Sequence, residues 1–377
     1  MIPSGWIIKK IGVIANVITG GTPSTFIKEY WNGNIRWMNS GELNLKKVRE
    51  VENRITKSGL DNSATKLIPK YCVLIGLAGQ GKTRGTVAMN MVELCINQSI
   101  AAIFPNEFLS NEFLYYYLDS KYKDLRKVST GVGGRGGLNL SIIKNYNIPF
   151  PKNKKEQNEI VTVLSDIDEL ISGLEKLIEK KKNIKQGAMQ ELLKSKKGWK
   201  NKKLGELLDY EQPTKYIVAN TDYNKNNSIP VLTAGKSFIL GFTNEENGIF
   251  RNFPVIIFDD FLTTSKYVDF PFKVKSSAIK ILKPKNSKVN IKFVFEAMQQ
   301  IIYTMGVGNH KRHWIGEFQK IEIKVPDTEE QNRISNILRE MDKEIKHIET
   351  KLEKHIMLKQ GMMQNLLTGK IRLIDNG

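Results

Sequence analysis

The chain contains one long segment twice, and this repeat constrains the fold more than any other feature. Residues 156–193 read EQNEIVTVLSDIDELISGLEKLIEKKKNIKQGAMQELL, and residues 330–367 read EQNRISNILREMDKEIKHIETKLEKHIMLKQGMMQNLL. The spacing does not drift, since Gln157 matches Gln331 and Leu193 matches Leu367 across the same offset. Two copies of one unit in one chain predict a pseudo-symmetric molecule, which suits a partner that also has two halves.

Each copy has the apolar pattern of a long supercoiled helix. The apolar residues recur in steps of four and three, which place them on one narrow stripe. The stripe consists of Ile160, Leu164, Ile167, Ile171, Leu174 and Ile178 in the first copy, and of Ile334, Leu338, Met341, Ile345, Ile348 and Leu352 in the second. A helix of about 38 residues extends roughly 57 Å at about 1.5 Å per residue, so it needs a long partner helix. A globular segment separates the two copies, and we therefore expect the two helices to pair antiparallel as a coiled coil.

Prolines mark where each repeated helix begins. Pro149, Pro151 and Pro326 stop the preceding strands, because proline cannot continue a strand ladder and biases its predecessor toward extended backbone. The basic run from Lys194 to Lys203 is typical of a linker into a second globular part. The predicted parts are a globular domain over residues 1–152, a long helix and linker over 153–197, a second globular domain over 198–327, and a second long helix with a C-terminal tail over 328–377.

The two globular segments resemble each other only in outline. A Gly-Val-Gly string at 131–133 corresponds to another at 306–308, and each is followed by a short strand that ends at Phe150 or Val325. Buried strands, short amphipathic helices and irregular loops predict mixed α/β domains of the α+β type. The scaffold repeats while the loop sequences differ, so we expect the two domains to read different things.

The charge of the chain favours a polyanionic partner. Lys and Arg number 58 against 39 Asp and Glu, which gives a net charge of +19. Nucleic acid is the first candidate and an anionic membrane the second. No apolar run approaches about 18 residues, and the N-terminus lacks the layout of a signal peptide, so a soluble cytoplasmic protein is expected. Cys72 and Cys95 support neither a disulfide framework nor a cysteine metal site.

One segment matches the phosphate-binding loop of nucleotide hydrolases. Gly76 to Thr83 fits G-x-x-x-x-G-K-[ST] and follows an apolar strand. That loop must open a helix whose N-terminal amides hold the phosphates, whereas Arg84 to Val87 contains a glycine and two β-branched residues and favours a hairpin. The acidic residue of a second nucleotide-binding strand, Asp259, would have to come from the other repeat. A P-loop-type nucleotide-binding protein using Gly76 to Thr83 remains an alternative.

Other short motifs predict no catalytic or metal site. Gly131-x-Gly133-x-x-Gly136 lies between a helix and a strand, the reverse of the order that dinucleotide binding needs. With Arg135 at its centre, this loop instead suits close approach to DNA. Glu322-Ile-Lys324 lacks the second carboxylate of a nuclease centre, and His310-x-x-His313 lacks further zinc ligands.

The duplicated order of motifs resembles the specificity subunit of type I restriction-modification systems. In each half a glycine-rich loop, a short strand, a proline, Glu-Gln and a long helix with a Lys-Gln-Gly and Leu-Leu ending follow one another. The similarity covers essentially the whole chain. Its strings lie at 20–24, 31–37, 131–139 and 151–157 in the first half, and at 210–215, 230–235 and 275–278 in the second. The second glycine loop, Gly306 to Arg312, departs from the pattern because it lacks the Gly-Gly-Arg-Gly-Gly of the first.

The resemblance implies a subunit without catalytic activity of its own, and with no cofactor or metal bound by this chain. In that family each target-recognition domain reads half of a bipartite double-stranded DNA sequence, and the two antiparallel helices set the distance between the half-sites. The helices also recruit two methyltransferase (modification) subunits, which carry S-adenosylmethionine. A restriction motor subunit then joins and consumes ATP with Mg²⁺. A stand-alone architectural DNA-binding protein, which would bind DNA independently of sequence, is a further alternative.

Residues that contact DNA are expected in loops where suitable side chains flank glycines. Phosphate contacts need Lys, Arg and backbone amides, whereas base reading needs Arg, Asn, Gln or Thr held at a groove. The candidates are Gln80, Lys82, Arg84 and Arg135 in the first domain and Lys236, Lys266, Lys311 and Arg312 in the second, with Thr22 and Ser24 as additions.

Overall fold

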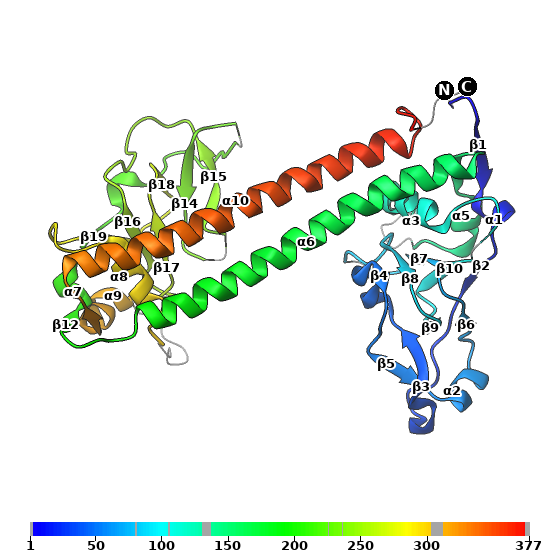
Figure 1. Ribbon diagram of the computed structural model, residues 1–377, viewed down its shortest axis with the longest axis horizontal. Coiled ribbons are helices and arrows are strands. Elements are labelled where there is room, and N and C mark those ends of the chain that lie inside the picture. The colour runs from blue at the N-terminus through cyan, green and yellow to red at the C-terminus, as the bar shows by residue number, and fades with distance from the viewer. Residues whose placement is uncertain are drawn as a thin grey trace. The chain divides into compact units, whose positions relative to one another are not determined.

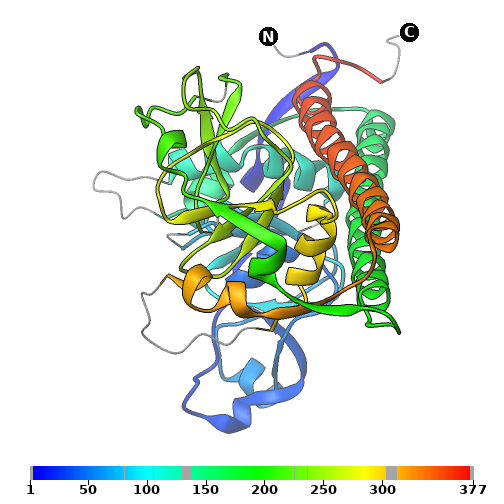
Figure 2. The same ribbon diagram turned by 90° about the vertical axis from the view of Figure 1, so that its left-hand side faces the viewer.

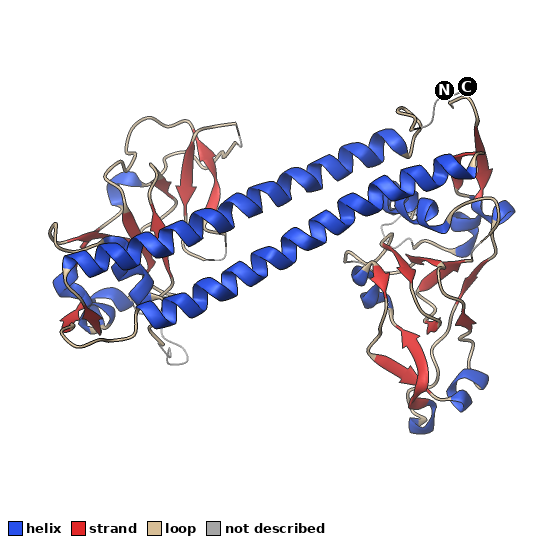
Figure 3. Cartoon of the chain, in the orientation of Figure 1, coloured by secondary structure: helices blue, strands red, loops and turns tan. Residues whose placement is uncertain are grey.

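The computed structural model describes residues 3–79, 81–104, 106–129, 137–224, 226–235, 237–302 and 312–373 (Figure 1). The chain forms two compact units. Unit 1 comprises Met1–Glu175 and Thr350–Gly377, and unit 2 comprises Lys176–Glu349. Each unit combines helices with short strands, in agreement with the predicted mixed fold class (Figure 3).

The repeated segments form two long helices, α6 (Lys154–Leu192) and α10 (Thr328–Leu366), of 39 residues each. Every residue of the predicted apolar stripes is buried or half-buried, which confirms the helical period read from the sequence. The other faces are rich in Lys and Glu, and among the described helices none has a stretch apolar enough to cross a membrane.

Ion pairs fix the relative direction of the two helices within each unit. Residue numbers rise along α6 as they fall along α10, so the helix segments are antiparallel, as expected. The pairs between the helices are Asp168 with Lys359 in unit 1, and Lys181 with Glu344 and Lys185 with Asp342 in unit 2. In unit 1, Glu156 of α6 also pairs with Arg372, which lies beyond the end of α10.

Short strands build the globular part of unit 1. One sheet has five strands in the order β2-β10-β7-β8-β4, a second has four in the order β5-β3-β9-β6, and β1 pairs with β11. The strands are β1 (Trp6–Lys10), β2 (Val17–Thr19), β3 (Trp31–Met38), β4 (Lys47–Val48), β5 (Asn53–Ile55), β6 (Leu67–Ile68), β7 (Val73–Gly76), β8 (Val87–Asn90), β9 (Leu94–Ile96), β10 (Ile100–Ile103) and β11 (Asn147–Pro151). The helices are α1 (Ile11–Ile14), α2 (Lys57–Asp61), α3 (Asn111–Ser120), α4 (Tyr122–Val128) and α5 (Leu140–Asn145).

Unit 2 is built in a related way. Its main sheet has the order β13-β19-β16-β17, a smaller sheet has the order β15-β14-β18, and β12 pairs with β20. The strands are β12 (Lys200–Lys203), β13 (Leu208–Glu211), β14 (Ile229–Leu232), β15 (Ile239–Thr243), β16 (Val255–Asp259), β17 (Ser265–Val268), β18 (Lys273–Val274), β19 (Ile279–Pro284) and β20 (Glu322–Val325). The helices are α7 (Leu204–Leu207), α8 (Ile291–Met298) and α9 (His313–Gly316).

Four strands of the main sheet in unit 1 correspond in order to the four strands of the main sheet in unit 2. The order β2-β10-β7-β8 in unit 1 matches β13-β19-β16-β17 in unit 2. The hairpin turns also match, since Gly76 N donates to Thr86 O at 3.0 Å and Asp259 N donates to Thr264 O at 2.8 Å. The weak sequence likeness of the globular segments therefore reflects a shared scaffold, on which the loops differ.

Each core is completed by the helix end of the other repeat. In unit 1, Ile160 and Leu164 of α6 share the core cluster with Leu366 and Leu367, at and just beyond the end of α10. In unit 2, the matched residues of α10 pack with the Leu-Leu string that closes α6. Burial of a leucine side chain contributes about 1.5–3 kcal/mol, so these two helix ends are substantial parts of the cores.

The repeated glutamine anchors a helix of the globular part in both units. Gln157 Oε1 accepts from Ser110 N at 2.7 Å, where α3 begins, and Gln331 Oε1 accepts from Asn290 N at 2.9 Å, where α8 begins. Both amide groups donate to the carbonyl of the proline that precedes the long helix. The two side chains are almost fully buried, so the Glu-Gln string of the repeat has a structural role.

A repeated aspartate forms a second link between the long helices and the globular part. Asp168 accepts from Tyr116 of α3 at 2.9 Å and pairs with Lys359. Its repeat partner Asp342 pairs with Lys292 of α8 at 2.7 Å, and α8 lies beside α10 in Figure 2. Burial tends to raise the pKa of Asp342, but its lysine partners hold that pKa below the usual range.

Candidate nucleic-acid interface

Several loops of unit 1 meet at one end of the five-stranded sheet. Leu77 N, at the start of the β7–β8 loop, donates to Ser99 O at 2.8 Å, and Leu77 O accepts from Leu138 N at 3.0 Å. Thr22 Oγ1 donates to Gln98 Oε1 at 2.6 Å. We name the resulting group the unit 1 loop surface, and it consists of the described residues among 20–24, 77–86, 97–99 and 137–139. The segments 20–24, 77–86 and 137–139, which were considered separately in the sequence, are thus neighbours.

Helix α4 holds the backbone of the β7–β8 loop. Arg126 Nη1 donates to Gly81 O at 2.7 Å and to Arg84 O at 3.3 Å, and Tyr122 OH donates to Lys82 O at 3.1 Å. Sequence reasoning missed Arg126 and Tyr122. The signal in the sequence that could have identified them was their spacing of one helical turn immediately before the glycine-rich loop. The backbone at Gly81, Lys82 and Arg84 is therefore held by α4, while the Lys82 side chain is exposed and that of Arg84 is half-exposed.

Two tryptophans hold the loop that carries Thr22 and Ser24. Trp37 Nε1 donates to Gly21 O at 3.0 Å, and Trp31 Nε1 donates to Ser24 O at 3.1 Å. At Gly20 a Cβ would lie 1.7 Å from Ile96 O, so only glycine allows this close approach. Thr22 and Ser24 are both exposed on a rigid segment, although the Thr22 hydroxyl is already bonded within the unit.

The segment that fits the phosphate-loop pattern connects two antiparallel strands. Ile75 of β7 faces Val87 of β8, and Val73 faces Met89. The described residues between these strands open no helix, so no helix N-terminus is directed at a phosphate. This hairpin agrees with the expectation from the β-branched residues, and nothing in its geometry favours the nucleotide-binding alternative.

Unit 2 brings the equivalent loops together. Asp260 N donates to Ala278 O at 3.1 Å and Asp260 O accepts from His313 N at 3.0 Å, which repeats the two bonds made by Leu77. We name this group the unit 2 loop surface, and it consists of residues 211–216, 260–264, 276–278 and 312–314. Arg312 is exposed within it, and Lys266 is exposed on the adjoining edge strand β17.

A compact charge cluster stiffens one side of the unit 2 loop surface. Glu211 accepts from Lys283 at 2.8 Å and from Tyr216 OH at 2.8 Å, and it pairs with Lys215 at 2.7 Å. Burial tends to raise the pKa of Glu211, but these donors lower it to about 2. The carboxylate therefore ties the segment after β13 to β19, and Lys215 is mostly exposed beside it.

The remaining candidates fall outside the described residues. These are Gln80, Arg135, Lys236 and Lys311. Of the described candidates, Thr22, Ser24, Lys82 and Arg84 lie on the unit 1 loop surface, Arg312 lies on that of unit 2, and Lys266 adjoins it.

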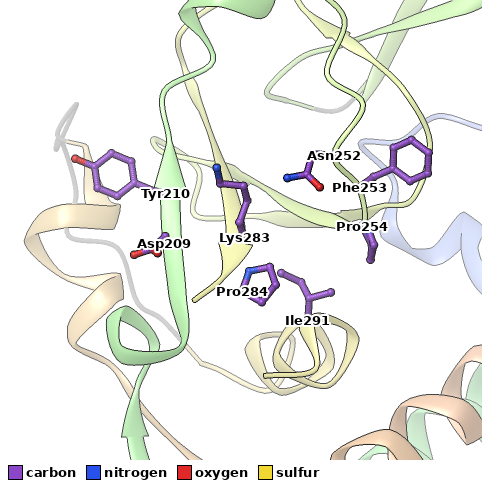
Figure 4. Close-up of a pocket in the computed structure, with 8 residues that line it drawn as sticks. All are labelled: Asp209, Tyr210, Asn252, Phe253, Pro254, Lys283, Pro284 and Ile291. Carbon is purple, nitrogen blue, oxygen red and sulfur yellow. The ribbon is translucent and has the colours of Figure 1, made fainter. Parts of the chain in front are cut away.

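A cavity in unit 2 lies mainly toward the other end of the sheet, although Lys283, which lines it, also donates to Glu211 at the edge of the unit 2 loop surface. It has a volume of about 430 Å³ and is lined by Asp209, Tyr210, Asn252, Phe253, Pro254, Lys283, Pro284 and Ile291 (Figure 4). In the sheet register Asp209 of β13 faces Lys283 of β19. Both residues lie toward the ends of their strands that are remote from Glu211 and Ile279. The candidate interface is therefore a surface of loops and does not include this cavity.

The cysteines and acidic residues do not form a reactive or metal-binding group where the chain is described. Burial raises the pKa of Cys72 to about 12 and that of Cys95 to about 11, which disfavours their thiolate forms. No cluster of three His, Cys, Asp or Glu side chains suited to a metal occurs among the described residues.

Known proteins are similar to this chain in sequence and in fold. A specificity subunit from Escherichia coli, of the type I restriction enzyme EcoR124I/EcoR124II, is 48% identical over 147 residues, which cover 37% of this chain and 36% of that protein. The MjaIX specificity subunit of Methanocaldococcus jannaschii is 33% identical over 233 residues, 56% of this chain and 53% of that protein. These matches thus span about a third and about half of the two relatives.

Solved structures match over nearly the full length. The S subunit of a type I restriction-modification system from M. genitalium superposes with a TM-score of 0.66 at 18% identity and covers 96% of both chains. A chain from a solved type I R-M system has a TM-score of 0.59 at 14% identity, with 98% of this chain and 100% of that chain covered. The family model described as type I restriction modification DNA specificity domain matches residues 3–186 and 196–357. The chain therefore belongs to the type I restriction-modification DNA specificity family.

Proposed function

We propose that this chain is the sequence-reading, non-catalytic subunit of a type I restriction-modification complex. Each unit reads one half of a bipartite double-stranded DNA target through its loop surface. The observation that carries the proposal is that equivalent sheet ends present different basic residues, Lys82 and Arg84 in unit 1 and Arg312 in unit 2. A net charge of +19 supplies the general attraction to phosphates.

The loops have the rigidity that base reading requires. Side chains that discriminate bases must be held at a groove, and a good bidentate pair contributes about 1–3 kcal/mol of discrimination. Arg126, Trp31 and Trp37 hold the backbone of the unit 1 loops through direct hydrogen bonds to carbonyls. Lys82 thus projects from a backbone segment that α4 holds. We assign Lys82 to the first half-site and the exposed Arg312 to the second.

We further propose that the long helices set the gap between the half-sites and offer surfaces to partner subunits. Helix α6 carries exposed Leu170, Leu177 and Ile184, which recur every seven residues and so share one face. On α10, Ile356, Met357 and Leu358 are also exposed. We assign these apolar positions to two methyltransferase subunits, which bring S-adenosylmethionine. A restriction motor subunit that uses ATP and Mg²⁺ completes the proposed complex.

The decisive experiment is to map methylated adenines in the host genome with and without this gene. Loss of methylation at one bipartite motif would support the proposal and identify the target. An unchanged methylation pattern in a host that expresses the complex would contradict it. Binding that is equal on random DNA and on every genomic fragment would instead identify an architectural DNA-binding protein.

Single substitutions then test the assignment of half-sites. Lys82→Ala should weaken binding or discrimination only at the first half-site, and Arg312→Ala only at the second, because the two residues belong to different units. Duplexes with a base change in one half at a time measure this. Equal effects of one substitution on both halves would contradict the modular reading.

The partner surface has a separate test. Leu177→Glu with Ile184→Glu places two charges on the exposed face of α6, while Glu179→Lys alters an exposed residue on another face of the same helix as a matched control. We expect the double variant to lose co-purification with the methyltransferase subunit and to keep its melting temperature. Retained co-purification would exclude this face of α6 as the contact.

The helices also predict the gap between the half-sites. Insertion of seven residues into both α6 and α10 preserves the heptad register and adds roughly 10 Å to each helix. The methylated motif should then have a gap longer by about three base pairs. A motif with an unchanged gap would remove the spacing role of the helices.

A further inference from the structure

A charged pair is buried in unit 2 where unit 1 has apolar residues. Asp260 makes the same two backbone bonds as Leu77, and Lys280 faces Phe258 in the sheet as Ala101 faces Ile75. Asp260 and Lys280 are 0% and 1% exposed, and Lys280 Nζ lies 3.5 Å from Asp260 Oδ2. The corresponding Leu77 and Ala101 belong to the apolar core of unit 1.

The shared scaffold does not require this pair. The desolvation of two buried charges is costly, and apolar residues of similar volume often serve as well or better. Unit 1 demonstrates this within the same chain, since its equivalent positions are apolar in an equivalent sheet. The Lys280 ammonium and the Asp260 carboxylate lie 3.5 Å apart, so their attraction is that of an ion pair and not of a close charge-assisted hydrogen bond.

The pair lies under the loops that are proposed to read DNA. Asp260 Oδ1 accepts from Trp314 N at 2.9 Å, and Asp260 O accepts from His313 N at 3.0 Å. These bonds hold the two residues that follow the exposed Arg312. Lys280 also lies over the ring of Tyr210 at 5.1 Å. Burial lowers the pKa of Lys280, Asp260 opposes this shift, and the charge of Arg312 adds to it, so Arg312 is electrostatically coupled to the pair.

We infer that Asp260 and Lys280 are positioning residues for recognition of the second half-site. The charge of Lys280 attracts the Asp260 carboxylate, this carboxylate holds the backbone at Trp314, and this backbone sets where Arg312 meets the DNA. The inference rests on the proposed function and deepens it, because it names the device that distinguishes the second reader from the first. An apolar pair in its place would keep the fold and lose the fixed position of Arg312.

The test installs the unit 1 residues in unit 2. Asp260→Leu with Lys280→Ala is assayed in the full complex with methyltransferase subunits, on the mapped target and on duplexes changed in one half. We expect discrimination at the second half-site to fall at least about tenfold, at the lower end of what one good base contact supplies, and discrimination at the first to stay within about twofold. Ile256→Val, a buried change elsewhere in the same core, is the control for a general loss of stability and should alter neither.

Thermal unfolding separates positioning from folding. Lys280→Ala alone leaves a buried carboxylate without its partner and should lower the melting temperature by roughly 10 °C. The double variant should recover most of this loss while its second-half discrimination stays low. If it does not fold, Asp260→Leu with Lys280→Met, which fills more of the buried volume at residue 280, takes its place. The same loss is expected because residue 260 no longer accepts from Trp314 N.

The outcomes are distinct. A folded double variant with second-half discrimination within about twofold of the original chain would overturn the positioning role. A matched loss in both half-sites would overturn it too, because the effect would then be general. An original complex that methylates without any bipartite preference would overturn the proposed function itself, and the inference with it.

Discussion

Replacement of Leu367 by alanine tests whether the end of α10 belongs to the core of unit 1. Leu367 is 1% exposed and shares a core cluster with Ile160 and Leu164. Truncation of a buried leucine costs about 2–5 kcal/mol, and we expect about 3 kcal/mol here because the side chain is enclosed. The matched residue Leu193 is only half-buried, so Leu193→Ala should lower the free energy of unfolding of unit 2 by roughly 1 kcal/mol.

Hydrogen exchange followed by mass spectrometry assigns each loss to a unit. Amides of β7 and β10 report on unit 1, and amides of β16 and β19 report on unit 2. A loss of 3 kcal/mol should accelerate exchange of the most protected unit 1 amides on the order of 100-fold, whereas Leu193→Ala should accelerate those of unit 2 by about fivefold.

The matched pair of variants can refute the composite core of each unit. If Leu367→Ala left β7 and β10 protected, the end of α10 would not be part of that core. Faster exchange confined to β16 and β19 would show that Leu367 packs in unit 2 and not in unit 1. Either result would contradict the composite cores on which the description of both units depends.

Other contacts predict effects on recognition, acid stability and assembly. Arg126→Ala removes the hydrogen bonds to the carbonyls of Gly81 and Arg84 and should lower discrimination at the first half-site about tenfold in the duplex assay. Lys123→Ala on the same helix is the control and should leave this discrimination unchanged. The pKa of Glu211 is lower in the folded chain than in the unfolded one, so its contribution to stability is present above the unfolded pKa and disappears as pH falls through the folded pKa. Unit 2 should therefore lose roughly 1–2 kcal/mol of stability between about pH 5 and pH 2. This figure is reduced because the partners of Glu211 are partly solvated. Denaturant titrations should show a flatter acid limb for Glu211→Gln, and an equally steep limb would exclude Glu211 as the source. A fragment of residues 1–197 should form a dimer in sedimentation experiments, because the Leu192-Leu193 string of one copy can complete the core of the other, and a stable monomer would refute this.

The repeat made the helical half of the fold predictable. Steps of four and three place Ile160 to Ile178 on one stripe, and a stripe of that length requires an equally long partner. The period alone could not reveal that Leu366 and Leu367 enter the core beside Ile160, because packing between distant segments leaves no local pattern. The hairpin at Gly76 was predictable for the opposite reason, since β-branched residues and glycine act locally.

The candidate interface was predictable in composition and less so in arrangement. The sequence pointed to Lys82, Arg84 and Arg312, which occupy exposed or half-exposed loop positions, and their contact with DNA stays a prediction. The residues that hold these loops, Arg126 and Asp260, carry no such signal. Their roles depend on hydrogen bonds to backbone carbonyls and amides of segments more than 40 residues away in the sequence. Such contacts become visible only when the sheet brings the segments to the same end.

The exchange of helix ends between the repeats also bears on how such a chain could arise. A gene that encoded a single repeat would already specify a complete molecule, because two identical products could finish each other's cores. Fusion of two such genes needs only the short stretch after Leu193 as a connection. Once they are fused, each half is free to diverge in its loops while the helices keep the pairing. The contrast between Leu77 with Ala101 and Asp260 with Lys280 is a divergence of this kind, and it reaches into the core itself.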